Sequence, residues 1–554
     1  MSSENDAELH RRLMILQEAM KEGKVKFSAA MADGVRDSLM AVRIGADGKV
    51  DLSTVDSRVR ALALAVTSMH DREETKKVIS LNELQRMYFS AVEINFHEFH
   101  KLMIEEKSNP HDVASFISSK PDLVSDIMQG LPNFLEVIQD LWAEAHEISN
   151  IHAEDMQCLK GVFGGDLFPS YEQNIASTCG VYVDTILLPD PFMRTNPLFT
   201  SISNSKKVYY LVKHALNILQ YKDLALAYVD PPIVAIVPDS IFFNEWDKEF
   251  LTGLANQDTL HHMGKLFGRT FTALEEIKEF IEPLQAPADA IQALRDKHRL
   301  LFDIEWTGSP EEQLIRHIKH YSGMFGDQHA GRAILFSSTG RMFQANDTLF
   351  RSRRLHGTPI IDAPTSWRFL QWKLEYDAER LNPDAVRTLH ITRGLQNAVT
   401  GKMAWLGNVP ASALIEMRKE GALPEIRAML STGISEILQT NPDDFNITSN
   451  KVISNIQFAF DSHLNKIKEL QDKQIRFGKV ELATCMTYGF VEIAAACGVP
   501  LVSLIKTVME QTIGVPNFKE RFEEIPAKYA ELESQVKKLE ATPVGLFFKH
   551  APVE

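Results

Sequence analysis

The sequence predicts a mainly α-helical, multidomain protein with a small α/β (mixed) insert in the middle of the chain. Helix start signals recur along the first 160 residues, β-rich apolar runs follow, and apolar spacing becomes helical again after residue 363. The 554 residues correspond to about three to five domains of ordinary size. We expect a helical domain at 1–160, an α/β domain at 170–356 and a helical C-terminal domain at 363–554.

The N-terminal region has two predicted helices with identifiable starts. Ser80-Leu-Asn-Glu83 is a capping-box pattern that opens a helix to about Lys107, before Asn109-Pro110. A looser version, Asn133-Phe-Leu-Glu136, opens a helix that can run to Gly161. Residues 39–52 carry two short apolar runs around Gly45-Ala-Asp-Gly48, which predicts a small hairpin.

The middle of the chain predicts a βαβ unit. Residues 181–188 and 233–237 are apolar and β-rich, and residues 206–226 between them have helical spacing. No glycine-rich phosphate loop follows the first strand. Residues 332–336 predict a further strand, with 341–343 returning as a hairpin.

Composition narrows the class of protein. Hydrophobic residues make up 44% and charged residues 24%, which is typical of soluble globular proteins and excludes disordered and collagen-like chains. The net charge of −15 would repel nucleic acid and anionic membranes if it were spread evenly. Four cysteines without a CxxC pair exclude a disulfide framework or zinc ribbon. With no signal peptide and no apolar run long enough to span a bilayer, we expect a cytoplasmic protein with no membrane partner.

Strong catalytic motifs for phosphate loops, zinc proteases and serine hydrolases are absent from the sequence. A weaker signal is a set of carboxylates near the ends of the predicted strands: Asp184, Asp190, Asp239 and Glu245. Their arrangement distantly resembles that of PIN-type nucleases. Acids that converge beside a parallel sheet can hold Mg²⁺ for water activation. The alternative is turn chemistry, because prolines accompany several of these acids.

The charge inverts in residues 314–356. This basic segment has seven Lys or Arg residues and two acids inside a chain of net charge −15. Such clustering favours contact with phosphates of nucleic acid or with another polyanion. The alternative is internal pairing with an acidic helix. The candidate polyanion-binding residues are Arg316, Lys319, Arg351, Arg353 and Arg354.

That acidic helix is the one expected to begin at Asn133, and residues 121–157 as a whole contain eight Asp or Glu residues and no Lys or Arg. Its acids predict a contact surface for a basic partner, either another protein or another part of this chain. A solvated helix face is the alternative.

A third candidate site is a possible metal site on the helix that Ser80 caps. Glu93, His97 and His100 follow at helical spacing on the flank of its apolar stripe, and could seed a divalent-metal site. No fourth ligand is identifiable, and a polar helix face explains the same residues.

From these observations we expect an interaction or scaffold component of a larger assembly, with a protein partner or a second copy of itself. Nucleic-acid contact through the basic segment is a further expectation. The alternative is a metal-dependent phosphodiesterase or nuclease that uses the four carboxylates. No cofactor is expected, apart from a divalent metal such as Mg²⁺ under that alternative.

Overall fold

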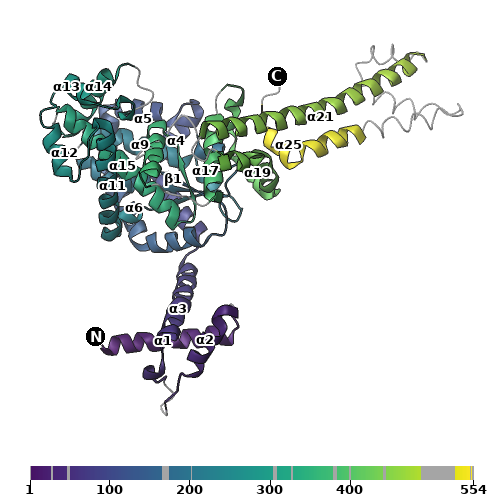
Figure 1. The fold of residues 1–554 in the computed structure, drawn as a ribbon. Coiled ribbons are helices and arrows are strands. Elements are labelled where there is room, and N and C mark those ends of the chain that lie inside the picture. Colours follow the sequence, from purple (N-terminus) through teal and green to yellow (C-terminus); the bar gives the residue numbers. More distant parts are fainter. Residues whose placement is uncertain are drawn as a thin grey trace.

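The computed structural model is mainly helical with a small parallel sheet at its centre, so the predicted fold class is confirmed (Figure 1). The described residues are 2–25, 29–45, 50–164, 174–200, 202–302, 308–325, 328–377, 383–398, 401–440, 445–487, 531–549 and 551.

The sheet has four parallel strands in the order β3-β2-β1-β4. The strands are β1 (Lys160–Gly164), β2 (Thr185–Pro189), β3 (Val234–Val237) and β4 (Thr358–Ile361). All are buried, as parallel strands covered on both faces must be. In the register, Val162 of β1 lies opposite Leu187 of β2 and Pro359 of β4. Proline lacks a backbone donor, and β4 tolerates it because β4 is an edge strand.

The βαβ prediction is confirmed between β2 and β3. The connection contains α8 (Pro191–Thr195), α9 (Asn204–Leu219) and α10 (Lys222–Ala225). The buried residues of α9 include Val208, Leu211, Val212, Ala215 and Leu219, which is the apolar spacing expected of a helix packed on a sheet.

Three local predictions are wrong or incomplete. The strands predicted at 332–336 and 341–343 lie inside one helix, α15 (Ala330–Arg354). A short apolar run cannot by itself distinguish strand from helix, and here buried Ala330, Ile334 and Met342 share one helical face.

The helix expected to begin at Asn133 is α6 (Pro121–Asp155), which starts twelve residues earlier and contains Pro132. Of the predicted hairpin at 39–52, the described residues show an antiparallel bridge between Ile44 and Val50, whereas residues 39 and 40 belong to the helix at Ala29–Met40 and residues 46–49 lie outside the described part of the chain.

Helices cover both faces of the sheet. On one face, Val162, Leu187 and Ala235 pack with Ala153 of α6 and Leu355 after α15. The opposite face joins the largest core cluster, which includes side chains from α9, α17 (Pro383–Ala398) and the capped helix α4 (Leu81–Glu105). That cluster draws on all three predicted domain ranges. The capping box at Ser80 and Glu83 is present as predicted.

A second core cluster lies in a lobe beside the sheet. Its helices are α11 (Glu245–Phe267), α12 (Leu274–Ile281), α13 (Pro287–Ala293), α14 (Pro310–Phe325) and the first half of α15. In Figure 1 these helices lie together on one side of the molecule.

The N-terminal arm consists of α1 (Ser2–Lys21), α2 (Ala29–Met40) and α3 (Ser57–Val78). It has a small core of its own, formed by Leu9, Leu13, Leu16, Val55 and Val59 together with Ala63. Figure 1 shows α1 and α2 standing away from the sheet, with α3 leading back to it. We call the chain from α4 onward the body.

The remaining helices complete the body. They are α5 (Pro110–Ser118), α7 (Ile175–Cys179), α16 (Pro364–Asp377), α18 (Ala411–Lys419), α19 (Leu423–Ser431), α20 (Ile434–Thr440), α21 (Phe445–Thr487) and α25 (Pro543–Phe548). Figure 1 shows α21 extending outward past α25. In the part of the chain that the structure describes, no helix is both long and apolar enough to cross a membrane.

Candidate functional site

The carboxyl edge of the sheet carries a buried cluster of two arginines and two aspartates. Asp239 follows β3 and contacts the guanidinium groups of Arg194 from α8 and Arg351 from α15, the latter at 2.9 Å. Arg194 also binds Asp347 of α15 at 2.9 Å. Each of these four residues is at most 8% exposed. We call this cluster the buried quartet (Arg194, Asp239, Asp347 and Arg351).

The buried quartet is balanced in formal charge, which is what its burial requires, because an unpaired charge away from water is very unfavourable. Burial alone raises the pKa of Asp239, but the charges of Arg194 and Arg351 lower it below its ordinary value. Burial and the nearby Asp239 charge raise the pKa of Asp347. Arg351 also donates to the backbone oxygen of Phe163 at 3.2 Å, so the quartet ties α8, α15 and the ends of β1 and β3 together.

Asp190 lies beside this cluster at the end of β2 and is fully hydrogen-bonded. It caps α8 through Phe192 N (2.9 Å), and it accepts from Tyr88 Oη (3.0 Å) and Trp142 Nε1 (2.7 Å). Burial raises its pKa to about 6, although these three donors oppose the shift. Asp190 therefore joins α4 and α6 to the sheet.

The four carboxylates predicted as metal ligands do not meet at one point. Asp190 and Asp239 lie at the carboxyl edge, whereas Asp184 precedes β2 and is about 20 Å away along the strand, at ~3.3 Å per residue. There Asp184 accepts from Leu159 N (2.9 Å) and pairs with Arg427 (2.7 Å). Glu245 is exposed in the first turn of α11, paired with Lys248 at 3.1 Å.

The residues of the predicted metal site on α4 are Glu93, His97 and His100, and two of them lie against other charged side chains. Glu93 pairs with Lys222 at 2.6 Å, and His97 lies 3.6 Å from the carboxylate of Glu98. Burial lowers the pKa of His100. Among the residues that the structure describes, no group of three or more His, Cys, Asp or Glu side chains is arranged to hold a metal ion.

The predicted polyanion-binding residues fall into three environments. Arg316 and Lys319 are exposed on α14, and Arg353 is exposed near the end of α15. Arg351 belongs to the buried quartet. Arg354 pairs with Glu154 of α6 and Asp247 of α11, each at 3.1 Å. The basic segment therefore does not form one continuous surface, and one of its arginines pairs with the acidic helix.

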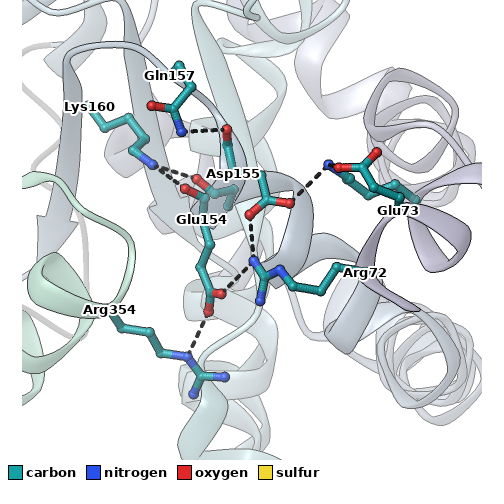
Figure 2. Close-up of polar contacts among 9 residues, drawn as sticks. Arg72, Glu73, Glu154, Asp155, Gln157, Lys160 and Arg354 are labelled. Carbon is teal, nitrogen blue, oxygen red and sulfur yellow. Dashed lines mark hydrogen bonds and ion pairs between the residues drawn. The ribbon is translucent and has the colours of Figure 1, made fainter. Parts of the chain in front are cut away.

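Figure 2 shows the ionic contacts at the carboxyl end of α6, where the N-terminal arm meets the body. Arg72 of α3 binds Glu154 at 2.9 Å and Asp155 at 2.7 Å. Lys76 of α3 binds Asp155 at 2.9 Å. Burial alone raises the pKa of Asp155, but hydrogen bonds from Arg72 and Lys76 lower it below its ordinary value. We call these contacts, with Arg354, the arm junction.

Two further features surround the arm junction. Lys160, 1% exposed, donates to the backbone oxygens of Ala153 (2.8 Å) and Glu154 (3.0 Å), so it binds carbonyls at the negative end of α6. A cleft of about 560 Å³ opens between arm and body, and its lining includes Arg12 and Arg72.

The acidic residues of α6 form two groups, one paired within the protein and one exposed to solvent. Glu154 and Asp155 pair inside the arm junction. Six other acids on the same helix are exposed: Asp122, Asp126, Glu136, Asp140, Glu144 and Glu147.

Sequence reasoning missed Arg194 and Asp347, the partners that complete the buried quartet. Asp347 and Arg351 are four residues apart, which places them on one helix face, but this signal was hidden because part of α15 was interpreted as strands. Arg194 lies one turn after Asp190 in a five-residue helix, and nothing in its local pattern indicates burial.

No protein-family model matches the chain, and neither a curated protein nor a solved structure matches it significantly.

Proposed function

We propose that this protein is an interaction component of a larger assembly and that its N-terminal arm is the element that docks a partner protein or a second copy of the chain. The observation that carries the proposal is the construction of the arm. Among the described residues, its apolar core is formed by side chains of the arm alone, and ionic contacts of α3 with α6 hold it to the body. Because the arm has its own core, it can keep its fold while its outer surface binds a partner.

The outer surface of the arm supports this proposal. Four methionines of the arm are exposed, from 41% for Met20 to 81% for Met40. Methionine is flexible and polarisable, so exposed methionines suit surfaces that adapt to a partner. Ile44, which is 64% exposed, adds a further exposed apolar side chain of the same element.

The acidic face of α6 supplies a second contact surface for a basic partner. Its exposed acids lie on the body, and of these Glu147 lines the cleft beside the arm junction. Complementary charge would increase the association rate and set the orientation of docking more than the final affinity.

A photo-crosslinking experiment tests the proposal on the full chain in its own cells. A photoreactive amino acid replaces Met40 or Met69 in the arm, or Met87 on α4 as the control, since Met87 is 52% exposed but lies in the body. We expect adducts of defined mass at the two arm positions and none at the control. Absence of adducts at both arm positions, or equal adducts at all three, would contradict the arm as the docking element.

We restrict the proposed phosphate-binding residues of the basic segment to Arg316, Lys319 and Arg353, which are exposed. Arg351 and Arg354 are occupied by internal carboxylates, so we do not include them in a phosphate-binding surface.

A further inference from the structure

A cavity of about 700 Å³ lies between α12, α14 and α15, in the lobe beside the sheet. This volume falls in the range of about 300 to 1,000 Å³ that is usual for small-molecule sites. Half of its lining residues are apolar: Leu274, Ile281, Ile318, Ala333, Leu335 and Phe336.

Two of the helices that line the cavity, α12 and α15, pack closely against each other. A Cβ atom at Gly331 would lie 2.8 Å from Cβ of Ile281, so only glycine lets α15 approach α12 this closely. The buried side chains of Leu314 and Ile334 join the core cluster of the same lobe. The cavity is therefore defined by rigid elements on α12, α14 and α15.

Cationic side chains lie at the opening of the cavity. Lys278 and Arg332 both line it, and their side chains are 63% and 52% exposed. Lys278 lies 3.7 Å from the carboxylate of Glu275, which is itself 75% exposed, so this pair is also open to solvent. Arg332 holds both carboxylate oxygens of Glu282 at 3.0 Å. This pair is exposed on both sides, and such pairs contribute little free energy, so an incoming anion can replace Glu282 at small cost.

His329 does not compete for the anion. Its Nε2 donates to the backbone oxygen of Glu282 at 3.0 Å, and its Nδ1 accepts from the backbone N of Arg332 at 3.3 Å. These two contacts assign the neutral tautomer and use both ring nitrogens.

We propose that this cavity binds a small carboxylate with an apolar chain. The chain occupies the apolar interior, and the carboxylate lies at the opening between Lys278 and Arg332. The proposal concerns a surface distant from the arm and does not depend on the proposed docking function.

Titration calorimetry on the full chain with saturated carboxylates, from octanoate to dodecanoate, tests the proposal. We expect the dissociation constant to fall about fourfold for each added methylene, because each contributes about 0.8 kcal/mol on burial. Alkyl alcohols and alkylammonium ions of equal length should bind about tenfold more weakly, since an alcohol offers Arg332 one neutral acceptor in place of two charged oxygens and an ammonium ion offers no acceptor. Absence of binding, or equal affinity for all three head groups, would overturn the proposal.

Variants locate the binding within the cavity. Ala333→Trp should fill the interior and abolish binding, and the double variant Lys278→Gln and Arg332→Gln should remove the preference for carboxylates. Lys265→Gln, an exposed lysine on α11 that does not line the cavity, is the matched control and should bind as the wild type does. If Ala333→Trp does not fold, Phe336→Ala removes a half-exposed wall residue and should weaken binding of every chain length. Binding unchanged in Phe336→Ala and in the double variant would place the ligand elsewhere.

Discussion

The side-chain amide of Gln85 forms two hydrogen bonds with the backbone of Ile236. Its Nε2 donates to the carbonyl oxygen at 2.9 Å, and its Oε1 accepts from the backbone N at 2.7 Å. Ile236 belongs to β3, the edge strand of the sheet opposite β4. Gln85 of α4 therefore takes the place of a further strand at this edge. It pairs the backbone N–H and carbonyl of Ile236, which would otherwise be buried without partners.

Replacing Gln85 by Leu should lower the free energy of unfolding by about 2 to 5 kcal/mol, since it leaves two buried backbone groups unpaired at about 1 to 3 kcal/mol each. Urea denaturation of the full chain measures the loss. Gln139→Leu is the control on α6, where the side chain is exposed, and should change stability by less than about 0.5 kcal/mol. Similar losses in the two variants would mean that the edge contact contributes nothing specific.

Local patterns were sufficient to predict the βαβ unit, because β2, α9 and β3 follow one another within about 50 residues and each has its own periodicity. They were insufficient for β1 and β4. These strands have five and four residues, contain glycine or proline, and pair with each other across nearly 200 residues of chain. Their strand character comes from burial in the sheet, which no local window contains.

For the candidate site as well, local sequence patterns predicted the positions of two acids but not the side chains that contact them. Asp190 and Asp239 were placed correctly at strand ends, because an acid followed or preceded by proline terminates a strand. Their chemistry depends on Arg194, Arg351, Tyr88 and Trp142, which reach them from other elements. Partners of this kind depend on tertiary packing, so strand-end acids alone cannot distinguish a metal site from an ion-pair cluster.

The buried quartet predicts a large difference between two arginines of the basic segment. Arg351→Leu should destabilise the protein by about 3 to 5 kcal/mol, because Asp239 then loses a partner while it stays buried. Arg316→Leu, at an exposed position on α14, should change stability by less than about 0.5 kcal/mol. Thermal and urea unfolding of both variants measure the difference, and equal effects would contradict the structural role of the quartet.

Asp190 predicts a specific pH dependence. Its pKa is raised from 3.8 to about 6, mainly by burial. The folded chain therefore holds the carboxyl proton of Asp190 more tightly than the unfolded chain does. Its contribution therefore favours folding at low pH and is lost as the pH rises from about 4 to about 6, a change of roughly 3 kcal/mol. Asp190→Asn cannot titrate, so the stability of the wild type relative to this variant should fall across that window. A difference that is constant or grows with pH would contradict the assignment.

Polyanion contact through the basic segment predicts a defined salt dependence. Each phosphate contact contributes a slope of about −0.9 on duplex DNA to the logarithm of the binding constant against the logarithm of salt concentration. Changing Arg316, Lys319 and Arg353 together to Ala should reduce this slope by up to about three such units. Arg354→Ala should leave it unchanged, because Glu154 and Asp247 already neutralise that guanidinium. Fluorescence anisotropy at several salt concentrations measures the slopes, and a larger effect for Arg354 would restore it to the phosphate-binding set.

The arm junction predicts that one charge reversal loosens the arm without unfolding the body. Arg72→Glu would place a third acid against Glu154 and Asp155, which the arginine now holds at 2.9 Å and 2.7 Å. Each of these pairs is partly exposed and contributes on the order of 1 kcal/mol or less, so the arm should detach while the core clusters of the body stay intact. Hydrogen exchange should then increase in the last turns of α3 and the facing end of α6. Lys77→Glu, at a side chain that is 69% exposed and paired with Glu74 of the same helix, is the control and should leave exchange unchanged. Because the arm has its own core, exchange at Leu13 and Val59 should stay slow in both variants, and fast exchange there would show that the arm depends on the junction for its folding.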